Sequence, residues 1–306
     1  MNQLNVVLVL LLTGSFALAE NSESLNSQDT SNKTPLREVL RQKKFADDSD
    51  ITDTKMKADE GSRSEYSVKF SLTYSGPPIG DLNNPKQPNP DGSIGTYDTR
   101  IGGAISGRFR LNPQSAISLG SGATALQPLQ GVTRYDVNNP FIAYDISGKW
   151  NGLQVRNYFS VVDATNPDFM AVGETGGAGY VNYAVYNIPN SKFAVELDTG
   201  FSYWVYNRGY IRTDKTAGQY FISLTPFVKY LATDKLNFNT SWFVQYMNPR
   251  SSTDSSVLNN KTVTEQMAMG YSISKDVYIS PYINFYPASL TAASTTINVS
   301  TTFSLL

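Results

Sequence analysis

Strict alternation of apolar and polar residues is the feature that most limits how this chain can fold. In residues 66–75, YSVKFSLTYS, every even position is apolar or aromatic and every odd position is Ser, Lys or Thr. Because successive side chains of a strand point to opposite faces, the segment predicts a strand with one apolar and one polar face. A soluble sheet buries its apolar face, whereas a membrane barrel turns that face outward to lipid. The rest of the chain has to distinguish the two.

The same alternation recurs along the chain and predicts twelve strands. They are expected at 66–75, 97–111, 115–125, 142–150, 153–161, 179–186, 192–206, 220–230, 236–246, 262–273, 277–285 and 295–305. Tight turns such as Asn151-Gly152 follow the even-numbered strands, and longer polar loops follow the odd-numbered ones. Most of the strands have the roughly 9–11 residues that a tilted strand needs to cross a bilayer.

An even number of strands, with short turns on one rim and long loops on the other, resembles the bacterial (Gram-negative) outer-membrane β-barrel proteins, in particular the porin-like ones. The resemblance covers residues 66–306 and implies an all-β fold, a closed antiparallel transmembrane β-barrel of about twelve strands. The polar faces are rich in Ser, Thr, Asn and Gly, as expected of a lumen, and aromatic residues gather near strand ends, where interfacial girdles form. A soluble β-sandwich or a lipocalin-like barrel stays open as an alternative, because secreted β proteins also alternate.

Two segments of different character precede the expected barrel. Residues 1–19 carry an apolar run and end on Ala17-Leu18-Ala19, which predicts a secretory signal peptide cleaved near Ala19. Residues 20–65 are polar and poor in aromatic residues, which predicts a mostly disordered periplasmic linker with a short helix at 34–42. Whether this linker plugs the barrel mouth stays open, as does a likeness to an autotransporter translocator.

Composition excludes several functions. The chain of 306 residues has no Cys and no His, and a formal net charge of −1, so neither a nucleic-acid partner nor a cofactor or metal ion is expected. Without His the usual general base and the Ser-His nucleophilic pair are absent, and we expect no enzyme. A barrel enzyme that works without His is a further alternative.

Charged residues on the polar faces are the candidate pore-lining residues, eight of them basic and four acidic. They are Lys69, Asp98, Arg100, Arg108, Arg110, Asp145, Lys149, Arg156, Lys192, Glu196, Asp198 and Lys229. An excess of basic side chains in a lumen favours anions. The hypothesis is therefore a porin-like channel for passive diffusion of ions or small hydrophilic solutes, with a mild preference for anions.

Two alternatives to this hypothesis remain. The charges can instead pair across an occluded interior, and the protein can be a non-conducting structural or surface-adhesion barrel. The resemblance implies outer-membrane lipid and lipopolysaccharide as surroundings and small solutes as cargo. Small residues expected on the outward face of strands two and three, among them Gly103, Gly107 and Ala123, leave a homo-oligomer open.

Overall fold

The computed structural model describes residues 51–62, 64–207, 217–260, 262–274 and 276–305. All described residues belong to one compact unit. The expected signal peptide and the helix expected at 34–42 lie outside the described residues. Within the described part of the chain, no helix is long and apolar enough to cross a membrane.

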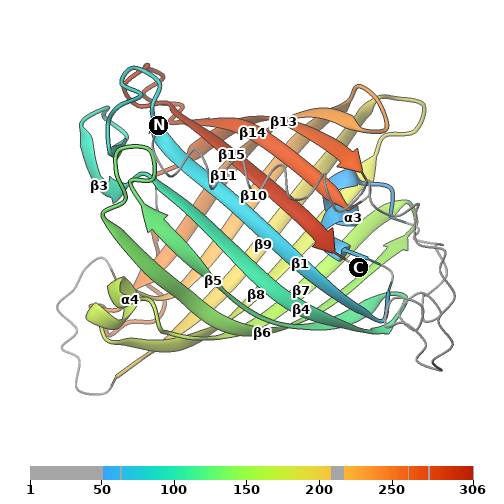
Figure 1. Ribbon diagram of the computed structural model, residues 1–306, viewed down its shortest axis with the longest axis horizontal. Helices are drawn as coiled ribbons and strands as arrows, with labels where there is room; N and C mark the ends of the chain where they lie inside the picture. The colour runs from blue at the N-terminus through green and yellow to red at the C-terminus, as the bar shows by residue number, and fades with distance from the viewer. Residues whose placement is uncertain (1–50, 63, 208–216, 261, 275, 306) are drawn as a thin grey trace, which may run out of the picture. The chain divides into compact units, whose positions relative to one another are not determined.

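Twelve antiparallel strands form a closed barrel (Figure 1). Their bounds are β1 (Tyr66–Pro78), β4 (Arg100–Asn112), β5 (Ser115–Leu126), β6 (Arg134–Trp150), β7 (Leu153–Asp163), β8 (Glu174–Asn187), β9 (Phe193–Tyr206), β10 (Gly218–Leu231), β11 (Leu236–Pro249), β13 (Thr264–Ser274), β14 (Val277–Phe285) and β15 (Thr296–Leu305). Each pairs with its neighbours in chain order, and β15 pairs with β1, so the sheet has no free edge. The predicted fold class and strand number are confirmed.

Strand boundaries agree with the prediction at the short turns and differ at some long loops. Strand β6 begins at Arg134 rather than 142, and β8 begins at Glu174 rather than 179. In both strands the ladder register shifts, between Gly120 and Gly122 for the β5–β6 pair and between Glu174 and Gly176 for β8. A bulge changes the phase of the alternation, which hides the strand from a period-two pattern.

The long loops carry the remaining small elements. Strands β2 (Lys86–Pro88) and β3 (Ile94–Asp98) form a hairpin, α4 (Pro167–Ala171) lies between β7 and β8, and β12 (Asn259–Asn260) pairs with β11. The first loop bonds to the last one, with Ile79 N donating to Thr295 O and Gly80 N to Ala292 O at 2.8 and 2.9 Å. This loop therefore packs along the long-loop rim.

The two faces of the barrel differ as the alternation predicts. On β4, Ile105 and Phe109 point outward and are exposed, whereas Arg108 and Arg110 point into the lumen and are buried. Large apolar side chains are exposed in the same way on the other strands, for example Ile142, Leu197, Ile222 and Met267. An apolar outer band and a polar interior are the arrangement of a membrane barrel, because hydrocarbon requires closed pairing and apolar contacts.

Aromatic pairs mark both ends of the apolar band. Near the short turns the rings of Phe193 and Tyr230 lie 5.3 Å apart, and towards the long loops those of Phe201 and Tyr220 lie 6.0 Å apart. These positions match the interfacial girdles of outer-membrane barrels.

Two amides interrupt the apolar band. Asn157 of β7 and Asn182 of β8 lie opposite each other on the outward face, and Asn182 Nδ2 donates to Asn157 Oδ1 at 2.9 Å. The hydroxyl of Tyr180 donates to the same oxygen at 2.8 Å. This pairing partly satisfies polar groups that are costly to leave unbonded in hydrocarbon.

Candidate functional site

A short segment that precedes the barrel in the sequence lies inside it. We call residues 51–62 the lumen segment; its helix α3 (Thr54–Glu60) begins at Asp53, whose side chain accepts a hydrogen bond from Met56 N at 2.9 Å. The helix ends at Gly61, whose φ of 69° is the left-handed conformation that glycine adopts readily. The two cap residues thus define this helix locally.

Hydrogen bonds to strands all around the barrel show that the lumen segment crosses the lumen. Gln154 of β7 accepts from Thr52 N and Asp53 N, Asn187 of β8 and Asn237 of β11 donate to Thr52 and Thr54, and Ser304 of β15 accepts from Ser62 N. These wall residues lie near the strand ends that lead into the short turns or the C-terminus. The segment therefore occupies the short-turn mouth, where Figure 1 shows α3.

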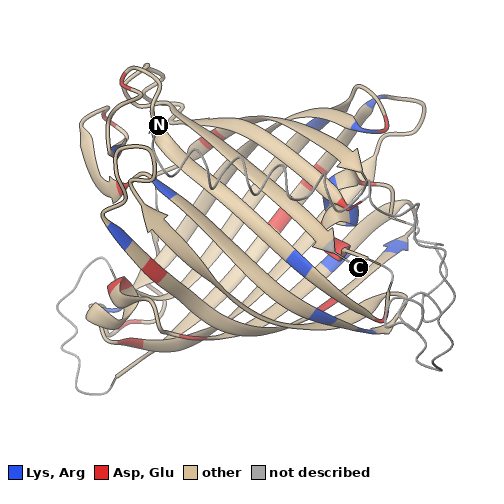
Figure 2. Ribbon diagram, viewed as in Figure 1, with Lys and Arg blue, Asp and Glu red and all other residues tan. Residues whose placement is uncertain are grey.

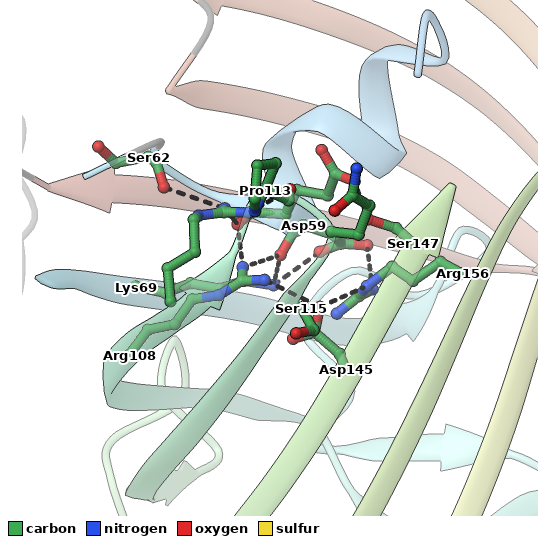
Figure 3. Close-up of polar contacts among 12 residues, drawn as sticks. Asp59, Ser62, Lys69, Arg108, Pro113, Ser115, Asp145, Ser147 and Arg156 are labelled. Carbon is green, nitrogen blue, oxygen red and sulfur yellow. Dashed lines mark hydrogen bonds and ion pairs between the residues drawn. The ribbon is translucent and has the colours of Figure 1, made fainter. Parts of the chain in front are cut away.

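One charge cluster holds the C-terminal half of α3 (Figure 3). Asp59 Oδ1 lies 2.9 Å from Lys69 Nζ, and Asp59 Oδ2 lies 3.6 Å from Arg156 Nη1. On the wall, Arg108 Nη2 and Asp145 Oδ1 form an ion pair of 2.8 Å, and Arg156 Nε lies 3.7 Å from the same oxygen. The cluster thus contains three cations and, besides Asp59, the carboxylate of Asp145.

Two arginines also bind the end of α3. Arg108 donates to the carbonyl oxygens of Asp59 and Glu60, and Arg110 donates to those of Glu60 and Ser62 at 3.0 and 3.1 Å. The carboxylate of Glu60 accepts from the Ser147 hydroxyl. The last carbonyls of a helix have no partner within the helix and carry partial negative charge, so the two guanidinium groups stabilise this end.

A second charge cluster holds the start of α3. Lys229 Nζ of β10 lies 2.8 Å from Asp53 Oδ2 and 2.5 Å from Glu196 Oε2 of β9. All three side chains are buried. Lys55 Nζ lies over the rings of Tyr183 and Phe227, 5.8 and 5.3 Å from their centroids. Lys229 therefore joins the lumen segment to the wall. In Figure 2 charged residues are few along the strands and gather around α3 and at the rims.

These contacts keep the two aspartates of the lumen segment ionised. Burial opposes ionisation of Asp59, but the charges of Lys69 and Arg156 outweigh it and hold the pKa of its carboxyl below the usual range. For Asp53 burial is again the opposing effect, and Lys229, with the backbone N–H of Met56, lowers the pKa. Both aspartates therefore contribute a negative charge to their ion pairs at neutral pH.

A cavity of about 300 Å³ adjoins Asp59. Its charged lining is Asp59, Lys69, Arg108, Asp145 and Arg156. The remaining lining consists of serine hydroxyls, among them Ser71 and Ser106, of aromatic rings, including Tyr158 and Tyr183, and of Ala104. The lumen thus contains a hydrophilic space next to the lumen segment.

The structure brings most of the expected pore-lining residues together in the lumen. Six are buried there: Arg108, Arg110, Asp145, Arg156, Glu196 and Lys229. Lys69 and Asp198 are half-buried on the same face, and Arg100 and Lys149 lie at its two ends. Pairing between wall charges, the alternative weighed above, occurs in Arg108–Asp145 and Lys229–Glu196.

Asp98 and Lys192 are corrections to the expected set. Asp98 is the last residue of β3 in the loop hairpin, and its carboxylate lies 2.7 Å from Lys86 Nζ. It does not line the lumen, because the barrel strand β4 begins at Arg100, which pairs with Ser75 of β1. Lys192 lies exposed in the turn before β9. Apolar–polar alternation in the sequence does not reveal at which residue a strand stops pairing with its neighbour in the barrel.

The sequence analysis places residues 20–65 in a linker and leaves open whether this linker plugs the barrel mouth. Residues 51–62 occupy that mouth, but the side chains that hold them there were not predicted. The functional residues of the lumen segment are Asp53 and Asp59, with Gln154 and Asn237 as wall partners. An aspartate N-cap at 53 followed by glycine at 61 is the available signal for the helix.

Comparisons with known proteins show the fold. No family model and no curated protein matches the chain. Among solved structures, the COG4313 outer membrane channel from Pseudomonas putida F1 aligns with a TM-score of 0.51 at 8% identity, over 78% of this chain and 95% of that chain. The NanC porin aligns with a TM-score of 0.45 at 7% identity, over 77% of this chain and 98% of that chain. The similarity to the COG4313 channel supports the closed β-barrel fold of this chain.

Proposed function

We propose that the protein is a porin-like channel of the bacterial outer membrane that is closed by its own lumen segment. Ions or small hydrophilic solutes diffuse passively through the barrel when this segment leaves the short-turn mouth. The observation that carries the proposal is a closed barrel with a polar, charged interior and an internal cavity of about 300 Å³. Lipid surrounds the apolar band, and lipopolysaccharide surrounds the long-loop end.

The charge of the wall supports a preference for anions in the open state. Of the expected pore-lining residues, five basic and three acidic side chains lie on the lumen face beneath the rims: Lys69, Arg108, Arg110, Arg156, Lys229, Asp145, Glu196 and Asp198. The lumen segment contributes Asp53, Asp59 and Glu60 next to the basic residues. Its departure removes these three carboxylates together with Lys55 and Lys57. The basic residues named above then outnumber the acidic ones on the wall, which attracts anions.

Single-channel recording tests the proposal. The full chain is compared with a variant that lacks residues 51–60, each in planar bilayers with a KCl gradient. We expect rare, short currents from the full chain and steady conductance from the variant, with a reversal potential displaced towards that of chloride. Gel mobility with and without boiling in detergent serves as the control, because an intact barrel migrates differently from the unfolded chain. A folded variant that stays silent would refute the channel, and a cation-selective variant would refute the anion preference alone.

A non-conducting structural or surface-adhesion barrel is the second candidate. It is favoured by the many hydrogen bonds and ion pairs with which the lumen segment occupies the mouth. The silent, folded variant described above is the result that supports it.

A further inference from the structure

Asp59 presents a carboxylate to the cavity, held there by two cations of the wall. Lys69 Nζ binds it at 2.9 Å, and Arg156 Nη1 lies 3.6 Å away. Arg156 is only 5% exposed and lines the cavity, and its Nε has no hydrogen-bond partner among the described residues although Asp145 lies 3.7 Å away. A planar guanidinium binds a carboxylate best through two short parallel hydrogen bonds. The contacts of Arg156 are longer than that.

We propose that the cavity next to Asp59 binds a small carboxylate anion, and that this anion competes with Asp59 for Lys69 and Arg156 and so releases the lumen segment. This inference rests on the proposed function, because it names the solute class and the signal for opening. Asp59 acts in it as an internal substitute for the ligand.

The lining of the cavity fits such a ligand. Serine hydroxyls of Ser71, Ser106 and Ser118 can bond its oxygens, and the rings of Tyr158 and Tyr183 lie under the guanidinium of Arg156 at 5.5 and 5.4 Å. These rings fix the guanidinium plane on one side of the cavity. A volume of about 300 Å³ admits a molecule of several heavy atoms, in addition to the carboxylate group.

Competition follows from the geometry of the charges. Arg108 already forms an ion pair of 2.8 Å with Asp145 of the wall, so a ligand carboxylate adds less binding energy there. Lys69 and Arg156, in contrast, pair with the lumen segment itself. A carboxylate that binds these two cations leaves the half-buried Asp59 without its partners, which destabilises the bound segment. Ligand and segment therefore exclude each other, and the ligand shifts the population towards the released state.

Thiol labelling measures this release without recording a current. The chain has no Cys, and Ala58 of α3 is only 3% exposed, so the thiol introduced by A58C reacts with a maleimide when the segment leaves the lumen. Lactate is the probe, compared with chloride at equal ionic strength and with glycerol at equal concentration. We expect lactate to raise the labelling rate in a saturable manner, about tenfold at saturation, which corresponds to about 1.4 kcal/mol. Equal effects of lactate and chloride would mean charge screening, and no effect would likewise overturn the inference.

Two variants separate competition from general loosening. D59N removes the internal carboxylate, so we expect a labelling rate raised about fivefold without lactate, and little further response to it. T54V removes only the hydroxyl that accepts from Asn237 Nδ2 at 3.2 Å, away from the cavity. It should raise the basal rate and retain the response to lactate. A D59N variant that responds like the parent would contradict the mechanism.

The two proposals fail in different ways. If lactate drives labelling while the variant without residues 51–60 is silent in bilayers, the carboxylate site stands and the channel does not. If that variant conducts and labelling ignores lactate, the channel stands and the carboxylate site does not.

Discussion

Replacing Lys229 by Met should release the start of the lumen segment. Lys229 is 4% exposed, and its Nζ lies 2.8 Å from Asp53 Oδ2 and 2.5 Å from Glu196 Oε2. Met is similar in length and keeps the packing, but it leaves the two carboxylates facing each other without a cation. Removing one partner of a buried ion pair costs about 3–5 kcal/mol. Glu196 belongs to the wall, whereas Asp53 can return to water if the segment leaves.

The magnitude follows from the lower end of that range. About 3 kcal/mol moves the equilibrium between the bound and the released segment by roughly 100-fold. The assay compares the maleimide labelling rate of A58C with that of A58C/K229M. S251C, at an exposed position of a long loop, is the control for thiol reactivity, and gel mobility verifies that each barrel is folded. Rates for A58C and A58C/K229M that agree within about threefold would refute the reasoning, because such a factor corresponds to less than about 1 kcal/mol.

Two further predictions concern pH and the outward amides. The pKa values of Asp53 and Asp59 are lowered in the folded protein, so their ion pairs stabilise the bound segment above the unfolded pKa and are lost only as pH falls through the lowered values. We therefore expect the A58C labelling rate to be unchanged between about pH 7 and pH 5; a steep rise across this window would contradict the assignment. N157L/N182L should raise the free energy of unfolding in lipid vesicles by about 1–2 kcal/mol, because the amides then no longer face hydrocarbon. A loss of stability in urea titrations would show that this face contacts protein instead.

The barrel could be predicted from the sequence because its signal is local. Alternation in a segment such as 277–285 reports both the strand and its two faces, and β14 has these bounds. The prediction loses accuracy where the phase changes, as at the register shifts that hide the starts of β6 and β8. Asp98 illustrates the same limit, since alternation continues through it although its strand belongs to the loop hairpin.

The lumen segment could not be predicted in the same way. A helix that packs on an apolar core shows an apolar stripe. The apolar contact of the lumen segment is small, Ile51 and Met56 against Val185 and Ala194, and the wall around it presents four cations, Lys69, Arg108, Arg156 and Lys229. A partner for such a wall is polar and charged, which is also the composition of a flexible linker. Composition therefore cannot distinguish a segment that binds inside the lumen from a flexible linker, and the caps at Asp53 and Gly61 are the features that indicate a helix.

The order in which the lumen segment opens follows from where the chain is tied to the barrel. Its C-terminal end continues into β1 at Tyr66, next to the bonds of Ser62 and Arg110, so this end cannot travel far. Because the tether is short, its local concentration near the wall is high and its contacts re-form readily. Among the described residues, side-chain contacts hold the N-terminal half: the Asp53–Lys229 ion pair and the hydrogen bonds to Gln154, Asn187 and Asn237. Of these contacts the ion pair is the buried, charged one. Opening therefore begins at Lys229, and K229M should increase the labelling rate of A58C more than D59N does; the reverse order would place the first step at Asp59.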